Sequence, residues 1–173
     1  MALRLLHYSD LENVYDEPRR AAKIAGLVER LRADSGPEPV VVGSGDNTAP
    51  GVLSLISEGR QSLDLYRDLD PDVETFGNHD FDYGLAATRE IVRKSPQTWV
   101  ASNVFLDGEH FGADAGVERW TIVERGDTRV GVFGVLDDAT PSLNPAAGPL
   151  SMTDPIAAAR EAIGELEARD VDA

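Results

Sequence analysis

The chain has 173 residues, a length that suits one ordinary domain large enough to bury a core. Its 31 acidic and 16 basic residues give a formal net charge of −15, and such a field disfavours binding to a nucleic-acid polymer. Cysteine is absent, which excludes disulfides, thiolate metal sites and a cysteine nucleophile. Acidic residues are spread along the chain and lysine is rare, so we interpret the charge first as a halophilic adaptation to high salt.

The sequence carries no pattern for insertion into a membrane or for export. No apolar run is long enough to span a bilayer. Residues 1–7 have neither the long apolar core nor the small-residue cleavage site of a secretory signal, and they read as the start of a first strand. We therefore expect a cytoplasmic protein without a membrane partner.

The first hundred residues alternate between short apolar runs and helical patterns. We expect strands at 3–8, 40–42, 73–76 and 99–101, and helices beginning near residues 18, 52 and 85. The pattern from 52 to 69 predicts one helix with an apolar face formed by Leu53, Ile56, Leu63 and Tyr66. Strand, loop and helix in alternation predict parallel βαβ units, in which ligands bind at the carboxyl ends of the strands.

The last third of the chain has a different pattern. Segments 120–124 and 129–135 flank Gly126-Asp127, which predicts an antiparallel hairpin in a mixed sheet or in a second sheet. Asp154-Pro155 reads as the N-cap and first position of an Ala-rich helix that runs to about residue 168. A crossover helix needs a following strand, and Val171 reads as its first residue, so we expect the chain to stop partway through a larger fold.

Polar clusters follow the first three predicted strands. Asp10 with Glu12, and Asp46 by itself, would each be read alone as ordinary turns or helix caps. The stretch from Gly77 to Asp82 favours a function, because a turn has no use for the imidazole of His79. Together, hard oxygen ligands at three strand ends suit two divalent ions that clamp an in-line displacement at phosphorus.

The other two histidines are weaker candidates for a site. His7 lies inside the first predicted strand, so we expect it to be packed in the core. His110, within Gly-Glu-His-Phe-Gly, is expected in an exposed loop. Neither follows a strand end together with other polar residues.

Four segments match one known family in order along the chain, at 5–10, 45–46, 77–84 and 101–104. With them the chain resembles the calcineurin-like metallophosphoesterases, and within these the 5'-nucleotidase / 2',3'-cyclic phosphodiesterase group. The stretch Gly-Asn-His-Asp-Phe-Asp-Tyr-Gly at 77–84 is the specific part of the match. The resemblance implies an α/β fold, a four-layer α-β-β-α sandwich with mixed sheets. Residues 1–173 would then be a single domain, the C-terminally incomplete N-terminal portion of the catalytic domain.

The resemblance also implies roles for individual residues. Asp10 would bind one of two divalent metal ions, Asp46 would bridge both, and Asn78 would bind the second. His79 would stabilise the phosphoryl transition state or assist the leaving group, with Asp82 orienting it. The substrate would be a phosphoester small molecule, with a nucleotide favoured and cyclic nucleotides, sugar nucleotides and other phosphoesters left open.

The chain departs from the family pattern at two places. Where the family has Asp-x-His, this chain has Asp10-Leu11-Glu12. Either Glu12 coordinates a metal ion and shifts the metal preference of the site from Zn or Fe toward Mn, Mg or Ca, or its side chain points away and the first metal site is lost. The family's later histidine ligands are absent, so the chain is an N-terminal piece of a longer phosphoesterase or a degenerate, non-catalytic metal- or phosphate-binding domain. An acidic scaffold without a site is the third interpretation. An unfinished sheet edge would favour a homo-oligomer.

Overall fold

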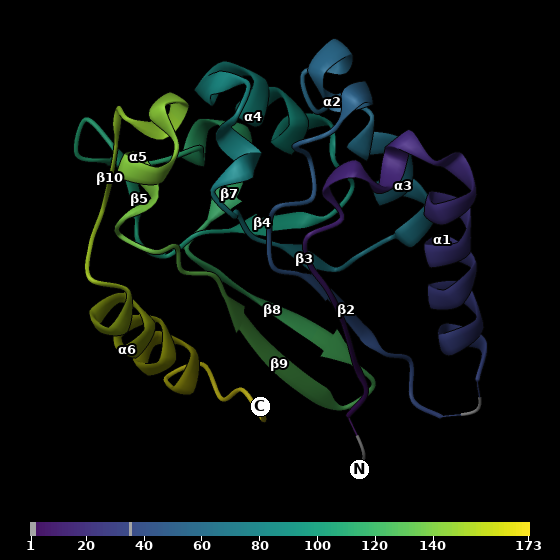
Figure 1. The fold of residues 1–173 in the computed structure, drawn as a ribbon. Helices are drawn as coiled ribbons and strands as arrows, with labels where there is room; N and C mark the ends of the chain where they lie inside the picture. Colours follow the sequence, from purple (N-terminus) through teal and green to yellow (C-terminus); the bar gives the residue numbers. More distant parts are fainter. Residues whose placement is uncertain (1–2, 35) are drawn as a thin grey trace.

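A parallel sheet of five strands forms the centre of the structure, a computed structural model that describes residues 3–34 and 36–173 (Figure 1). Residues 1–2 of the N-terminal segment discussed above lie outside this description. The strand order is β1-β2-β3-β4-β7, and every neighbouring pair is parallel, as the βαβ pattern predicts. The strands are β1 (Leu5–Tyr8), β2 (Val40–Gly43), β3 (Val73–Glu74), β4 (Thr98–Val100) and β7 (Val117–Glu118).

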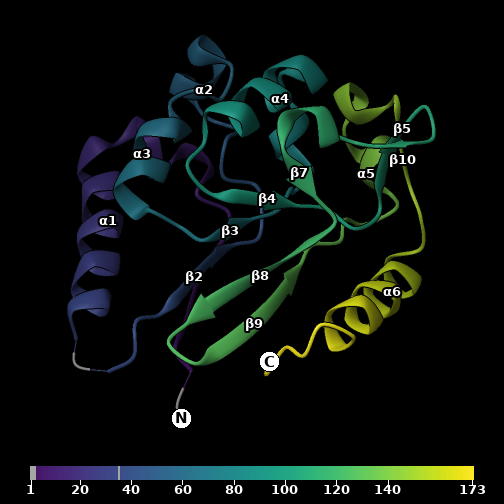
Figure 2. The ribbon, with the colours of Figure 1, turned by 180° about the vertical axis from the view of Figure 1, so that it is seen from behind.

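Helices cover one face of this sheet (Figures 1 and 2). Around α1 and α3, Val28, Val41 and Leu69 are buried in one apolar cluster, and around α4, Ile91 and Trp99 belong to a second. The helices on this side are α1 (Pro18–Ala33), α2 (Val52–Ser57), α3 (Ser62–Leu69) and α4 (Gly84–Lys94).

A hairpin and a helix form two further layers beyond the central sheet (Figure 1). The hairpin consists of β8 (Trp120–Arg125) and β9 (Thr128–Phe133), and it turns at the predicted residues 126–127. The Ala-rich helix α6 (Pro155–Glu167) packs on it, with Leu166 against Gly131. The Asp154 carboxylate caps α6 by accepting the N–H of Ala157 at 2.7 Å. The predicted α/β class, hairpin and capped helix are therefore confirmed.

The remaining elements are short. A three-stranded antiparallel sheet has the order β10-β5-β6. His110 lies in β6 of this sheet, where it is half-buried and its Nε2 is 2.7 Å from the carbonyl of Ala101. The expected exposed loop is wrong because Gly108 is part of the tight turn between β5 and β6, which places His110 in a strand. The short elements are β5 (Val104–Leu106), β6 (Glu109–His110), β10 (Leu150–Met152), α5 (Thr140–Leu143), and the 3₁₀ turns at Glu12–Asp16, His79–Phe81, Ala113–Ala115 and Pro145–Ala147.

The single helix expected from 52 to 69 is wrong, because the chain breaks it after α2. Glu58 and Gly59 have φ of 53° and 82°, left-handed values that end a helix. Leu53 and Ile56 are 41% and 78% exposed, whereas the apolar residues of the second half are buried in α3. Helical periodicity alone cannot reveal such a break.

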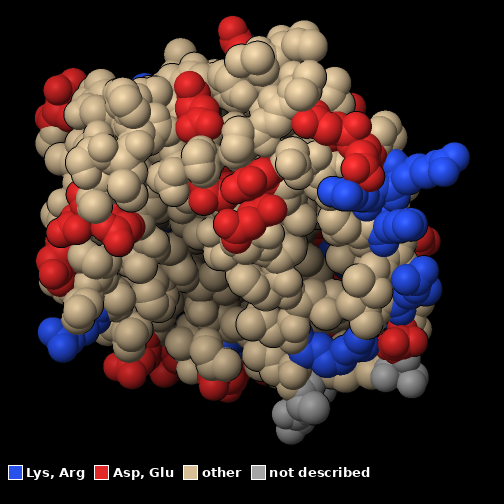
Figure 3. All heavy atoms as spheres, viewed as in Figure 1, with Lys and Arg blue, Asp and Glu red and all other residues tan. Residues whose placement is uncertain are grey.

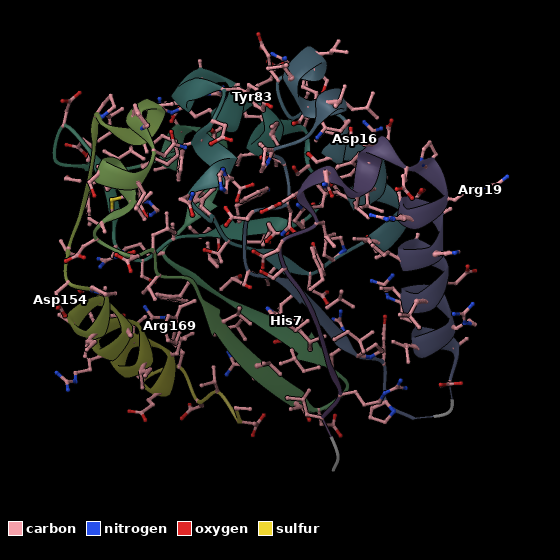
Figure 4. The ribbon with its side chains drawn as sticks, viewed as in Figure 1. His7, Asp16, Arg19, Tyr83, Asp154 and Arg169 are labelled. Carbon is pink, nitrogen blue, oxygen red and sulfur yellow. The ribbon has the colours of Figure 1, made fainter. Side chains whose placement is uncertain are left out.

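The expectation that His7 is a core residue is also wrong. His7 is exposed on β1, where its Nε2 lies 2.8 Å from Ser44 Oγ (Figure 4). Leu5 on the same side of the strand is 57% exposed, so this edge of the sheet is uncovered.

The end of the chain runs beside β9. Asp172 donates its N–H to the carbonyl of Arg129 at 2.8 Å, and the Ala173 carbonyl accepts the N–H of Gly131 at 2.8 Å. Residues 171–173 do not form a strand, although they are hydrogen-bonded to the edge of β9 beside which such a strand would lie. None of the helices described is long and apolar enough to cross a membrane.

Candidate functional site

The loops after β1 and β2 are joined by backbone hydrogen bonds. Asp10 donates its N–H to the carbonyl of Gly45, and Glu12 donates to the carbonyl of Asp46, both at 3.2 Å. Asp10 and Asp46 have φ of 56° and 55°, the left-handed region that aspartate tolerates better than most residues. Two carboxylates are thus held in strained turns at adjacent strand ends, a type of strain that clusters at functional sites.

The loop after β3 packs tightly against the loop after β2. The Asp46 Oδ1 atom accepts the backbone N–H of His79 at 2.7 Å. A Cβ on Gly77 would overlap the Asp46 carboxylate, and one on Gly45 would overlap the backbone of Gly77. These two glycines are therefore required for the close approach of the two loops.

Helix α2 also joins the outer parts of these loops. Asp16, at the end of the 3₁₀ turn that starts at Glu12, accepts the N–H groups of Val52 and Leu53, both at 2.8 Å (Figure 4). These bonds lower the pKa of Asp16. The hydroxyl of Tyr83 lies 2.8 Å from Ser54 Oγ of the same helix.

His79 forms an ion pair with Asp82 one turn later. The ring Nδ1 lies 3.1 Å from Asp82 Oδ2, and the side chains are 38% and 25% exposed. Partial burial opposes a charge on the ring, but the hydrogen bond and charge of Asp82 outweigh it and raise the pKa of His79. With Nδ1 occupied, Nε2 is the nitrogen that can act on a substrate.

Asn144 fixes the carboxylate of Asp82 from a distant part of the chain. Its Nδ2 donates to Asp82 Oδ1 at 2.8 Å and to the carbonyl of Asn78 at 2.7 Å. Asn144 was not predicted as a site residue, because Asn before Pro145 is typical of an ordinary turn, and its side-chain oxygen does accept the N–H of Ala146. No local signal in the sequence indicates the contact with Asp82.

Two buried carboxylates lie beneath the loops. Asp80 accepts the N–H groups of Gly77 at 2.8 Å and Asp46 at 2.9 Å, and burial raises its pKa to about 6. Glu74 is fully buried in β3, and burial together with the charge of Asp80 raises its pKa to about 8. In the sequence, Glu74 is only one position of a predicted apolar strand, with no sign of its burial.

The structure brings the predicted site residues to one edge of the sheet. Burial raises the pKa of Asp46, and the negative charges of Asp10 and Asp82 add to the rise. Glu12, which is half-buried, raises the pKa of His79. In residues 3–34 and 36–173, however, no group of three or more histidine, aspartate or glutamate side chains is placed to hold a metal ion. The ligand assignment to Asp10, Glu12, Asp46 and Asn78 thus stays a prediction.

Acidic side chains dominate the middle of the face shown in Figure 3, whereas basic side chains gather mainly along the side where α1 lies. An acidic surface of this kind attracts cations and repels polyanions.

Known proteins resemble this chain in sequence and in fold. The chain is 27% identical over 188 aligned positions to an apyrase of Anopheles gambiae, covering 98% of this chain and 33% of that protein. An apyrase of Aedes aegypti is 21% identical over the same coverage. The chain thus spans about a third of the length of the curated relatives it matches.

Solved structures share the fold. A 5'-nucleotidase precursor from Thermus thermophilus matches with a TM-score of 0.86 at 20% identity, covering 98% of this chain and 35% of that one. The NAD nucleotidase of Haemophilus influenzae matches with a TM-score of 0.85 at 17% identity, covering 98% and 33%. The model of the Calcineurin-like phosphoesterase family matches residues 3–145, and the chain belongs to that family.

Proposed function

We propose that this chain is the N-terminal portion of the catalytic domain of a metal-dependent phosphoester hydrolase that acts on nucleotides. The observation that carries the proposal is His79, whose ring is oriented by Asp82 beside the carboxylate of Asp46. Membership of the calcineurin-like family supports the reaction class, and the apyrase and nucleotidase names of its relatives support a nucleotide substrate.

The donor atoms of the site suit a divalent metal in kind. Asp10, Glu12, Asp46 and Asn78 would supply carboxylate and amide oxygens, which favour Mn²⁺ or Mg²⁺ over softer ions. Burial raises the pKa of Asp46 and the negative charges of Asp10 and Asp82 add to the rise, an electrostatic setting that a cation would relieve. When bound, such ions would activate a water molecule and neutralise charge on the phosphoryl group.

The protein's own contribution is a positioned proton donor. Asp82 accepts the hydrogen on Nδ1 of His79 and so leaves Nε2 toward the substrate, while Asn144 fixes Asp82. The raised pKa keeps more of the imidazole protonated near neutral pH. His79 can therefore donate a proton or a hydrogen bond to the leaving oxygen, a step worth about 10²–10⁴-fold in rate.

A second candidate, a non-catalytic metal- or phosphate-binding domain, is favoured by Glu12, which stands where the family pattern has a histidine. Such a domain would retain cation or phosphate binding without turnover.

A hydrolysis assay distinguishes these proposals. We would measure release of phosphate from AMP and ADP, and cleavage of a phosphodiester, with Mn²⁺, Mg²⁺, Ca²⁺ and Zn²⁺ in turn. His79→Gln should lower kcat by about 100-fold or more, whereas His110→Gln, the same change outside the site, should leave it near the parent value. Equal activity of the His79→Gln variant and the parent would refute the role of His79.

Calorimetric titration with Mn²⁺ distinguishes a non-catalytic metal-binding domain from a domain without a site. Binding that is lost in Asp46→Ala, without turnover of any phosphoester, would favour the non-catalytic domain. Absence of binding, with no effect of Asp46→Ala, would refute both proposals and favour an acidic domain without a site.

A further inference from the structure

Asn47 lies at the centre of the loops that carry the predicted ligands, although it is not one of those ligands. It is completely buried, and its side chain and backbone are both hydrogen-bonded. Its Oδ1 accepts the N–H of Leu11 at 3.1 Å, between Asp10 and Glu12 in the chain. Its carbonyl accepts the hydroxyl of Tyr15 at 2.7 Å. Asn47 thus connects the loop after β2 to the loop after β1.

The other side of Asn47 is held by the buried carboxylates. Its Nδ2 donates to Glu74 Oε2 at 3.2 Å, and its backbone N–H donates to Asp80 Oδ1 at 3.3 Å. Glu74 also accepts the hydroxyl of Tyr8 at 2.8 Å and the N–H of Gly45 at 3.2 Å. One buried network therefore joins β1, β3 and the loops that follow β1, β2 and β3.

We infer that Asn47 and Glu74 are positioning residues whose amide–carboxylate bond sets the spacing between the loop of Asp10 and Glu12 and the loop of Asp46. Through that spacing the pair controls the affinity for a divalent cation without contacting it. The inference rests on the proposed function, because it concerns the same site. Groups that orient metal ligands from behind typically change metal affinity by about 10- to 100-fold when they are replaced.

The donor and acceptor pattern offers a test by exchange. Glu74→Gln keeps the size of the side chain but replaces one oxygen by an NH₂ group. In one orientation this NH₂ group faces Asn47 Nδ2, and in the other it faces the N–H groups of Gly45 and Thr75. In both orientations a donor therefore meets a donor. Adding Asn47→Asp to Glu74→Gln exchanges the carboxyl and amide groups between the two positions and so restores a donor–acceptor pair. The oxygen that accepts from Leu11 is retained in the double variant.

The measurement is the Kd for Mn²⁺ from calorimetry on the protein that carries this chain, with the melting temperature measured in parallel. We expect Glu74→Gln to weaken Mn²⁺ binding by about 10-fold or more and the double variant to recover most of that loss. Ser62→Ala removes another buried hydrogen bond, to the carbonyl of Gly59 at 2.7 Å, and should lower the melting temperature with no change in Kd.

Each outcome decides the inference. Unchanged affinity in Glu74→Gln, or a double variant as weak as the single one, would overturn the positioning role while leaving the proposed function intact. Absence of Mn²⁺ binding by the parent would overturn both. If Glu74→Gln does not fold, Tyr8→Phe, which removes one donor to Glu74, replaces it: several-fold weaker binding supports the inference and an unchanged Kd overturns it.

Discussion

The ion pair of His79 and Asp82 makes a quantitative prediction for the metal-free protein. Asp82→Asn removes the negative charge 3.1 Å from Nδ1 while keeping an oxygen that can accept its hydrogen. The two side chains are 38% and 25% exposed, so water screens the pair. We therefore expect a coupling free energy of about 1 kcal/mol, at the upper end for exposed pairs.

The sign of the pH dependence follows from the direction of the shift. The pKa of His79 is higher in the folded chain than in the unfolded one, so the pair stabilises the protein fully below the unfolded pKa. This stability is lost as the pH rises through the folded pKa. Asp82→Asn should thus cost about 1 kcal/mol of unfolding free energy at about pH 5.5 and much less at about pH 8.5.

Two measurements check this prediction. Proton NMR of the imidazole ring of His79 follows its titration, and Asp82→Asn should lower the pKa of His79. Urea unfolding at the two pH values gives the stability difference. Asp114→Asn, at an exposed ion pair with Arg89, is the matched control that should leave the His79 titration unchanged. An unchanged pKa of His79 in Asp82→Asn would refute the orienting role of Asp82.

Three further predictions concern the same loops. Gly77→Ala should destabilise the chain by about 1–3 kcal/mol and weaken Mn²⁺ binding, because the new Cβ would overlap the Asp46 carboxylate. Gly164→Ala in α6, where the Cβ meets open space, should instead stabilise the chain by about 0.5–1 kcal/mol. Thermal unfolding of the two variants compares these effects. Because the pKa of Glu74 is raised to about 8, unfolding free energy should fall as the pH rises from about 4.5 to about 8, and Glu74→Gln should flatten that slope in denaturant titrations. Glu12→His should raise affinity for Zn²⁺ relative to Mn²⁺ in competition titrations, and a parent protein that already prefers Zn²⁺ would contradict the assignment of Glu12 as a hard ligand.

Much of the fold could be predicted from local pattern. Short β-branched runs followed by polar turns are sufficient to identify parallel strands, and the hairpin and the capped α6 have signals that lie within a few residues. The break between α2 and α3 could not be predicted. It depends on left-handed Glu58 and Gly59, and a Cβ on Gly59 would crowd Ile91 of α4, a neighbour far along the sequence.

The candidate site likewise contains residues that the sequence identifies and residues that it does not. Asp46, His79 and Asp82 fall within compact motifs, so sequence alone brings them to attention. Asn144 and Glu74 do not, because their partners lie far along the chain. Asn144 reaches Asp82 across 62 positions, and Glu74 receives hydrogen bonds from Tyr8 of β1 and from the loop after β2. An acidic residue inside a strand pattern becomes informative only when burial is known.

The electrostatics of the site connect its stability to its chemistry. Burial raises the pKa of Asp46, and the charges of Asp10 and Asp82 add to the rise, which means that these two carboxylates repel the charge of Asp46. The loops hold them together nevertheless, through hydrogen bonds from the backbone N–H groups of Asp10, Glu12 and His79. A divalent cation that binds the folded chain would offset this repulsion and stabilise the fold by mass action. The strained turns and the buried network would then hold the acidic edge of the sheet in the arrangement that a bound cation stabilises.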